Sequence, residues 1–309
     1  MSLPRQTKAK RRQAFGEWRY WGLLLISPWL IGFVVFKLIP ILSSLVLSFT
    51  DFYLLEPGKT EFVGFHNYLV ALKDSSTRVV LYRTILLALS IIPVQIAASI
   101  FFAALLSHKK LLGKNVMRTL FFLPSIIPSV AFTFMWQGFV DPTSGWLDRL
   151  ILGPIGLSSL NHFYGREAGN ALFILSSLWT IGPGMLIIMG AMQAIPTEIY
   201  EAAHVDGAGS LKRFLTMTLP LVTPALFFTL ILNLTAVFGG AIMLDRGFTF
   251  NSNLSSFDEL VYFTVFRAFK LGAGTSLAWI FFVFAMALVV TLFVTSKYWV
   301  YYPEPERRS

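Results

Sequence analysis

The sequence predicts an all-α polytopic membrane protein with six transmembrane helices, and two observations lead to that prediction. The first is composition: 55% of the 309 residues are hydrophobic and only 13% are charged, with a mean hydropathy of +0.67. Soluble domains carry about 25% charged residues, so this chain cannot cover six buried helices with a polar shell. The second is a series of uncharged runs near the length of about 20 residues that crosses a bilayer. The expected spans are residues 21–49, 84–107, 119–140, 170–195, 215–244 and 273–296.

The basic residues predict how these spans are oriented. A basic tail at 1–19 precedes the first span, and most of the 25 Lys and Arg residues fall on the same side as this tail. Short cytoplasmic loops carry the excess of Lys and Arg, so we expect the tail 1–19 and the short tail 301–309 in the cytoplasm, flanking one membrane domain over 20–300. The net charge of +9 fits topology and anionic lipid better than nucleic acid, because the basic cluster Lys8–Arg12 has no nucleic-acid motif beside it.

The spans contain almost none of the side chains that ion-coupled transport uses. Lys37 is the one ionisable residue in them, and we expect it near the outer end of its span, with its ammonium reaching the interface. Proton coupling needs carboxylates or histidines within the membrane, although sodium coupling through backbone carbonyls stays possible. An energy source outside the membrane explains this pattern better.

Catalytic and metal-binding patterns are also missing from the sequence. Gly58-Lys59-Thr60 matches only the end of a phosphate-binding P-loop, because Tyr53 stands where its first glycine is required. The four histidines are scattered through predicted loops and cysteine is absent. We therefore expect a chain that is not an enzyme and that holds no metal or cofactor.

The segment 196–213, between the fourth and fifth spans, predicts two short helices joined by a turn; we call it the elbow. Pro196 fits the first turn of a helix, and Thr197–Val205 places two glutamates near its N-terminal end, where the helix dipole favours acids. Asp206 and Gly207 end this helix, because glycine adopts the left-handed conformation of a C-cap at little cost. Ser210 is expected to cap the second helix.

The first helix of the elbow predicts a docking surface. Ile199, Ala202 and Ala203 form a small apolar face, and Glu198 and Glu201 lie on the same helix. Helices that lie on lipid usually combine Lys and Arg with large apolar side chains. Small side chains and acids favour close packing against another protein, and an interfacial helix is the alternative.

Three parts of the chain together resemble a known family. The run EAAHVDGAG at 201–209, followed by Leu219-Pro220, resembles the EAA signature of permease subunits from binding-protein-dependent ABC importers, in the maltose- and glycerol-phosphate-type carbohydrate branch. Phe62–Tyr68 and Arg118–Pro124 resemble two further elements of that branch. The outer loop 245–270 departs from the family pattern, so family contacts in that loop are not carried over.

The resemblance implies the type I ABC importer permease fold, with the elbow as its cytoplasmic coupling helix. Glu201 would pair with a basic residue of an ATPase, the two alanines would let the helix seat deeply, and Gly207 would allow the turn. The implied coupling set is Glu201, Ala202, Ala203, Asp206, Gly207 and Ala208.

The resemblance also implies partners, cargo and location. Implied partners are a second and different permease, two copies of a cytoplasmic ATPase that uses ATP and magnesium, and an extracytoplasmic solute-binding protein. The cargo would be a sugar or sugar derivative, and the chain would lie in the plasma (inner) membrane of a bacterium or archaeon. From the residues alone, a secondary ion-coupled transporter and a non-transporting scaffold remain the alternatives.

The polar residues of spans four and five give a candidate substrate path, because such side chains in hydrocarbon usually face protein or a cavity. The alternative, equally open, is that they only bond neighbouring helices. We also expect a kink at Gly182-Pro183-Gly184. Trp136 and Trp179 could stack on a sugar ring, although tryptophan is also common in membrane interfaces and cores. The candidate path residues are Ser176, Trp179, Thr180, Asn233, Val237 and Gly240.

Overall fold

A computed structural model describes residues 8–108, 111–140, 145–154, 156, 176–238 and 256–302. The described residues are almost entirely helical, with two isolated β-bridges in place of a sheet, which confirms the all-α class. They divide into two compact units. Unit 1 comprises Met1–Ala71 and Thr264–Trp279, and unit 2 comprises Leu72–Phe263 and Ile280–Ser309.

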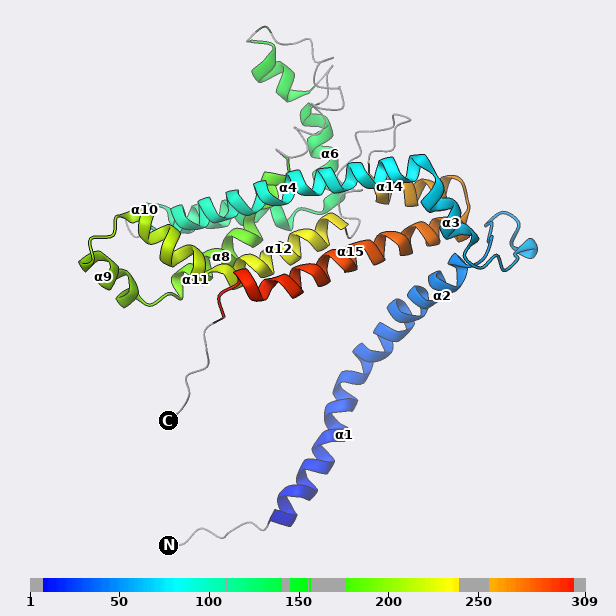
Figure 1. Cartoon of the computed structure of the whole chain (residues 1–309), viewed down its shortest axis with the longest axis horizontal. Helices are drawn as coiled ribbons and strands as arrows, with labels where there is room; N and C mark the ends of the chain where they lie inside the picture. Colours follow the sequence, from blue (N-terminus) through cyan, green and yellow to red (C-terminus); the bar gives the residue numbers. More distant parts are fainter. Residues whose placement is uncertain are drawn as a thin grey trace. The chain divides into compact units, whose positions relative to one another are not determined.

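Unit 1 begins with one long helix, apolar over Trp21–Ser48 (Figure 1). Its parts are α1 (Lys8–Phe33), the π-helical turn η1 (Val34–Leu38) and α2 (Ile39–Ser48). Pro40 has no N–H to donate, and the wider turn just before it accommodates the missing bond without ending the helix. Lys37 lies in that π-helical turn and is exposed.

The rest of unit 1 is a loop that folds back on the end of α2. It contains the short turn η2 (Pro57–Lys59) and leads into α3 (His66–Lys73). The Asn67 amide donates hydrogen bonds to the carbonyls of Ser48 and Thr50, at 3.1 and 2.7 Å. After η8 (Phe263–Arg267), the start of α15 (Leu271–Trp299) bonds to the same loop. The Leu54 N–H donates to the Phe269 carbonyl at 2.9 Å, and the Gly272 N–H donates to the Phe52 carbonyl at 3.1 Å. Gly272 is required there, because a Cβ would lie 2.0 Å from the Thr50 carbonyl oxygen.

Unit 2 contains the remaining helices. Its core is formed by α4, α8 and α12 packed against one another, with α5 and α14 alongside (Figure 1). The elements in chain order are α4 (Ser75–Ser107), α5 (Lys114–Phe122), η3 (Leu123–Ile126), α6 (Ser129–Val140), η4 (Asp148–Leu152), η6 (Leu178–Thr180), α8 (Gly182–Gln193), α9 (Thr197–Val205), α10 (Ser210–Arg213), η7 (Phe214–Thr218), α11 (Leu219–Leu221), α12 (Thr223–Phe238), α14 (Phe257–Tyr262) and the later part of α15.

The longest helix of unit 2 starts at a well-formed cap. The Asp74 carboxylate accepts hydrogen bonds from the Thr77 backbone N–H and hydroxyl, both at 2.8 Å. These bonds favour the charged carboxylate, so the Thr77 N–H, followed by its hydroxyl, lowers the pKa of Asp74 below its ordinary value. The cap satisfies an N–H that the first turn of α4 otherwise leaves without a partner.

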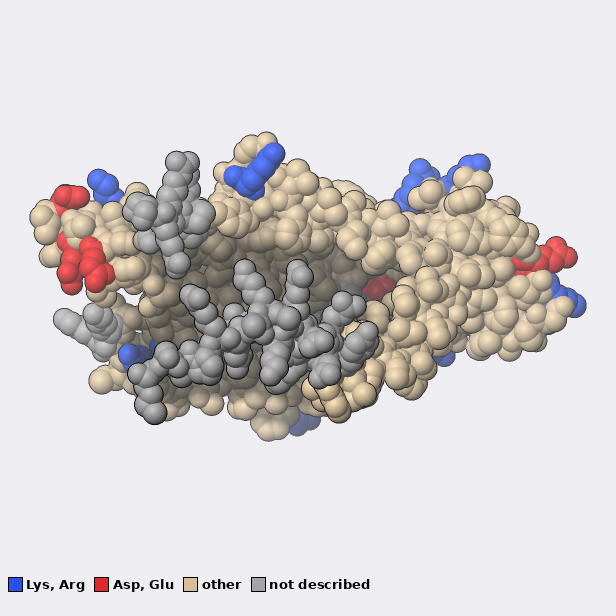
Figure 2. All heavy atoms as spheres, turned by 90° about the horizontal axis from the view of Figure 1, so that it is seen from below, with Lys and Arg blue, Asp and Glu red and all other residues tan. Residues whose placement is uncertain are grey.

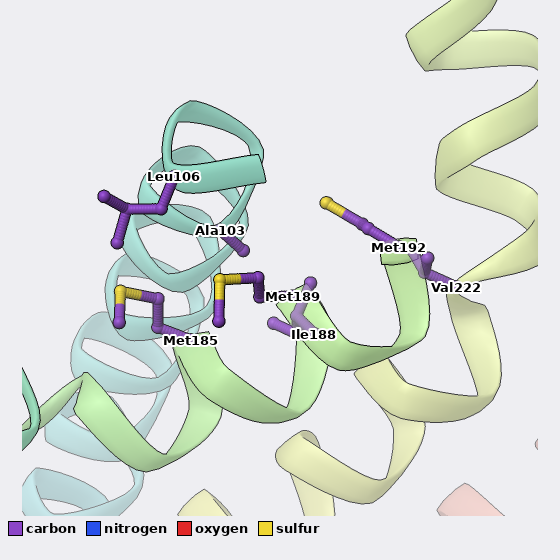
Figure 3. Close-up of a cluster of buried hydrophobic side chains, with 7 residues drawn as sticks. All are labelled: Ala103, Leu106, Met185, Ile188, Met189, Met192 and Val222. Carbon is purple, nitrogen blue, oxygen red and sulfur yellow. The ribbon is translucent and has the colours of Figure 1, made fainter. Parts of the chain in front are cut away.

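A buried methionine-rich cluster holds α4, α8 and the break before α12 together (Figure 3). Methionine side chains are flexible and fill irregular gaps between helices. On one side α8 approaches α5 so closely that a Cβ on Gly182 would lie 2.3 Å from the Phe121 carbonyl oxygen. The cluster consists of Ala103, Leu106, Met185, Ile188, Met189, Met192 and Val222.

A bend of 65° separates the segment Ser210–Leu221 from α12. The bend lies at Val222, which is fully buried in the methionine-rich cluster. The far end of the chain also holds it, because the Tyr301 backbone N–H donates to the Thr223 hydroxyl at 2.8 Å. The bend is therefore a packed feature of the fold.

Within the described part of the chain, three helices are long and apolar enough to cross a membrane, and the bent pair before and within α12 is a fourth candidate if it is one span. These segments overlap the expected first, second, sixth and fifth spans. The expected third span is divided into α5, η3 and α6, and α8 begins at Gly182-Pro183-Gly184, where we expected a kink inside the fourth span. Residues 170–175 and 239–244 lie outside the described part of the chain. The count of six spans therefore stays a prediction.

Candidate functional site

The elbow has the two helices that the sequence predicts. Its first helix, α9, runs from Thr197 to Val205 as expected, although Pro196 is the N-cap residue and lies outside the first turn. The end of α9 is a Schellman motif, because the Ala208 N–H donates to the Ala203 carbonyl and the Gly207 N–H to the His204 carbonyl, both at 3.0 Å. Gly207 has φ +75°, the left-handed conformation that favours glycine.

The second helix of the elbow begins differently from the prediction. Ser210 is the first residue of α10 and does not cap it, because Gly209 occupies the N-cap position and no side chain accepts a bond there. α10 runs directly into the π-helical turn η7 and then into α11, so the arm after the turn is one continuous helix up to the bend at Val222.

The outward surface of α9 is an acidic stripe. Glu198, Glu201, Ala202 and Val205 are all exposed, and their spacing of three or four residues places them on one helical face. Figure 2 shows acidic side chains gathered at the left end of the view, where Figure 1 places α9. Val205 is 88% exposed, so the stripe also carries an apolar side chain with no cover among the described residues.

The structure corrects the apolar face that we expected on α9. Ala203 is only 1% exposed and lies against its own chain, while Ala202 faces outward and Ile199 is half-buried. A helix turns about 100° per residue, so Ala203 lies about 160° around the axis from Glu201 and faces away from the stripe. Only Ala202 of the two alanines contributes to the outward stripe.

A cavity of about 360 Å³ lies within unit 2, between α4, the η3–α6 segment, the start of α8, and α12. Ligand pockets commonly enclose about 300–1,000 Å³. None of the described residues that line it carries a charge. The lining residues are Ile91, Gln95, Ser99, Pro124, Ser125, Ile127, Phe132, Ser176, Ser177, Thr180, Ile181, Pro183, Gly184, Thr229, Leu232, Asn233, Ala236 and Val237.

Hydrogen bonding already uses some of the polar groups around this cavity. The Gln95 amide donates to the Ser177 carbonyl at 3.1 Å, and the Thr180 hydroxyl donates to the same carbonyl at 3.0 Å. The half-buried Asn233 carboxamide differs, since it has no hydrogen-bond partner among the described residues. Its donor and acceptor atoms are therefore available to a ligand with hydroxyl groups.

The structure brings four of the six candidate path residues to the cavity: Ser176, Thr180, Asn233 and Val237. Trp179 is not in the lining; its ring packs edge-on against Trp136 at 5.6 Å. Trp136 is buried at 7% exposure and also contacts Phe132 and Phe139, so its faces are not open to stack on a sugar. Gly240 lies outside the described residues.

Sequence reasoning missed several lining residues on helices that it had identified. Gln95 and Ser99 are four residues apart on α4, and Thr229 and Asn233 are four apart on α12. Residues four apart lie on one face of a helix, so each pair of polar side chains in an apolar span indicates a polar face. Gly184 was read only as part of a kink, but a Cβ there would lie 2.9 Å from the Thr229 methyl and 3.2 Å from the Ser99 hydroxyl.

The helix α8 connects the cavity to the elbow. Gly184 at its start lines the cavity, and its end continues through Ile195 into α9. At 1.5 Å per residue, its 12 residues extend about 18 Å. Between these two ends, α8 packs into the methionine-rich cluster through Met185, Met189 and Met192. Among the described residues no group of acidic or histidine side chains could hold a metal ion.

Comparison with known proteins gives matches over most of the chain. A family model described as the binding-protein-dependent transport system inner membrane component matches residues 95–302. The probable ABC transporter permease protein YesP of Bacillus subtilis (strain 168) is 33% identical over 92% of this chain and 93% of its own length.

Two further relatives have names that state a substrate. The sn-glycerol-3-phosphate transport system permease protein UgpA of Yersinia pestis bv. Antiqua (strain Antiqua) is 30% identical over 88% of this chain and 90% of its own length. The arabinooligosaccharides transport system permease protein AraP of Bacillus subtilis (strain 168) is 28% identical over 75% of this chain and 72% of its own length.

The fold matches a solved structure. A chain of a bacterial ABC transporter involved in the import of the acidic polysaccharide alginate superposes with a TM-score of 0.75, over 94% of this chain and 99% of that one, at 20% sequence identity. That likeness shows the fold, which is the type I ABC importer permease fold expected from the sequence.

Proposed function

This chain belongs to the family of inner membrane components of binding-protein-dependent transport systems, and from that premise we propose how it works, what it carries and what it binds. The chain is a permease subunit of an ABC importer. We propose that the elbow couples it to a cytoplasmic ATPase and that the cavity of unit 2 lies on the path of a sugar or sugar derivative.

The acidic stripe on α9 is the observation that carries the coupling proposal. Glu201 is exposed at its centre, and the described residues include no basic partner for it. A charge-assisted pair with a basic residue in a groove of the ATPase would fix the register of the helix. Gly207 shapes the turn, and the Schellman bonds of Asp206–Ala208 hold the second arm at a set angle.

The neutral lining of the cavity supports a sugar or sugar derivative as cargo. Amide groups such as that of Asn233 bind sugar hydroxyls, and the described lining residues carry no charge. The named relatives carry arabinooligosaccharides and sn-glycerol-3-phosphate. Ser176, Thr180, Asn233 and Val237 are the proposed path residues, with Trp179 and Gly240 as less central members.

The proposed assembly contains this permease, a second and different permease, two copies of the ATPase, and an extracytoplasmic solute-binding protein. ATP and magnesium would act in the ATPase, with no cofactor and no catalytic site in this chain. The basic tail would keep both termini in the cytoplasm, which places the elbow on the same side as the ATPase.

The test is a capture experiment in detergent with the purified ATPase of the same transporter. Glu201→Arg reverses the charge at the centre of the stripe, so we expect capture and ATP-driven uptake to fall to background. Glu61→Arg, which changes an exposed carboxylate in unit 1, is the matched control and should keep both. Normal capture and uptake by Glu201→Arg would overturn the coupling proposal.

Uptake by vesicles reconstituted with the transporter tests the alternative function, a secondary transporter. If uptake persists without ATP and follows an imposed sodium or proton gradient, the ion-coupled alternative holds. We expect no uptake under a gradient alone, since Lys37 is the one ionisable side chain in the expected spans.

A further inference from the structure

The hydroxyl groups of Tyr200 and Thr218 lie 2.9 Å apart and join the first helix of the elbow to the continuous helix that follows its turn. Tyr200 is on α9, and Thr218 is the last residue of the π-helical turn η7 in the opposite arm. Either hydroxyl can be the donor. Among the described residues this is the one side-chain hydrogen bond between α9 and another element.

The Thr218 hydroxyl is used differently from those of other helical threonines in the chain. Thr216, two residues earlier, donates to the Lys212 carbonyl at 2.8 Å, and Thr229 donates to the Ala225 carbonyl at 2.8 Å. Such bonds, to the carbonyl four residues back, are the ordinary choice for a threonine in a helix. Thr218 bonds to Tyr200 instead, and at 6% exposure it does so away from solvent.

The contact faces inward and is separate from the docking stripe. Tyr200 and Ala203 are three residues apart on the inner face of α9, one half-buried and the other buried, while Glu198, Glu201 and Val205 face outward. A hydroxyl pair on the inner face cannot bind a protein seated on the outer face. It can set the angle at which the outer face is presented.

We propose that Tyr200 and Thr218 are positioning residues for energy coupling. Their hydroxyl contact fixes α9 to the arm Ser210–Leu221, so that both arms move as one body about the bend at Val222. Without it, α9 is joined to that arm through the turn at Asp206–Gly209. A force applied to α9 then turns the helix before it moves the arm. This inference rests on the proposed function, since it takes the elbow as the point where the ATPase acts.

The test removes one hydroxyl at a time from the complete transporter, reconstituted with its ATPase and binding protein. Tyr200→Phe and Thr218→Val each delete the contact and keep the shape of the side chain. We expect capture of the ATPase to be unchanged, while the number of substrate molecules imported per ATP falls about two- to tenfold, as for the loss of one hydrogen bond. The double variant should be no worse than either single one, because each removes the same bond.

Two control variants separate a positioning role from a general loss of stability. Thr216→Val removes a hydroxyl from the same turn that bonds only within its own helix, and it should keep the import ratio. Thr218→Ser keeps the hydroxyl and should restore the ratio. An unchanged ratio in Tyr200→Phe and Thr218→Val, or an equal fall in Thr216→Val, would overturn the inference.

Amide hydrogen exchange on the permease without its ATPase gives a readout that does not depend on the proposed function. We expect the amides of α9 to exchange on the order of two- to tenfold faster in Tyr200→Phe, and unchanged exchange would overturn the inference. If Glu201→Arg leaves capture normal while α9 exchanges faster in Tyr200→Phe, the coupling proposal fails and the structural contact stands. If Glu201→Arg abolishes capture of the ATPase and Tyr200→Phe leaves exchange in α9 unchanged, the coupling proposal stands and the positioning inference fails.

Discussion

The elbow and the cavity of unit 2 lie at opposite ends of α8 and are built from opposite kinds of contact. The elbow comes from one continuous stretch, and backbone bonds around Gly207 set its shape. Its outer face is exposed and acidic. The cavity draws its lining from segments between Ile91 and Val237, is held by side-chain packing, and has no charge on its described lining.

This difference separates the effects expected from mutation. In the elbow, a change should alter how the ATPase binds or how force reaches the spans, without altering what the cavity accepts. In the cavity, a change of side-chain volume should affect passage and stability, while the outward stripe still binds its partner. The following predictions test that separation, from the largest expected effect to the smallest.

Gly207→Pro should have the largest effect. Proline holds φ near −65°, whereas Gly207 has φ +75° and its N–H donates to the His204 carbonyl. The turn cannot form, so ATP-driven uptake by reconstituted vesicles should fall to background. Gly207→Asn is the control: asparagine tolerates the left-handed conformation and a Cβ there meets open space, so most uptake should remain. Uptake near normal in the proline variant would show that the elbow's shape is not required.

Gly184→Ala should affect the cavity and leave the elbow intact. Its methyl group would lie 2.9 Å from the Thr229 methyl, so we expect overpacking to cost about 1–3 kcal/mol of stability and to narrow the cavity. Uptake should fall severalfold, with capture of the ATPase unchanged. Gly190→Ala, on the same helix with nothing within 4 Å of its Cβ, should be neutral or stabilising. Loss of capture in Gly184→Ala would break the proposed separation.

Asn233→Ala should have a moderate effect confined to transport. Removing one carboxamide that bonds the passing sugar should lower the rate of uptake, at saturating loaded binding protein, about two- to tenfold. Thr235→Ala is the matched control, because its exposed hydroxyl bonds to the Ile231 carbonyl within the helix. An equal fall in both variants would mean that Asn233 serves helix packing.

Asp74→Ala should have the smallest effect, on stability alone, since Asp74 belongs to neither region. Loss of the α4 cap should cost about 1 kcal/mol. Because the folded pKa of Asp74 is lowered by the Thr77 N–H, its charge stabilises the fold fully above its ordinary pKa. That stabilisation is lost as the pH falls through the lowered value. As the pH is lowered through the acidic range, the melting temperature of the wild type should fall more than that of Asp74→Asn. Parallel curves of melting temperature against pH for the two proteins would refute this.

How much the sequence could predict follows the same division. The bounds of α9 and its stop at Asp206 and Gly207 were predictable, because cap and turn preferences act within a few residues. The burial of Ala203 was not predictable, because cap and turn preferences do not say which face of a helix the fold covers. For the same reason the Tyr200–Thr218 contact was missed, since its two residues are 18 positions apart.

The cavity was predictable only in part. Polar positions in apolar spans indicated Ser176, Thr180 and Asn233, which the structure places together. Gln95 and Ser99 were missed, because the lack of charge in the second span predicts a membrane helix but does not indicate which of its faces is polar. The edge-on contact of Trp179 with Trp136 depends on α6 and η6 meeting in space, which no local pattern encodes.

The bond from Tyr301 to Thr223 also has a consequence for how the chain is made. Thr223 leaves the ribosome 78 residues before the residue that bonds its hydroxyl, and chains are completed from the N-terminal end at roughly 5–20 residues per second. For several seconds the bend must therefore form without that support. During this interval the bend depends on earlier contacts, such as the packing of Val222 in the methionine-rich cluster and the bond from the Thr223 hydroxyl to the Pro220 carbonyl at 2.6 Å. Synthesis of the final helix and Tyr301 then adds the last bond.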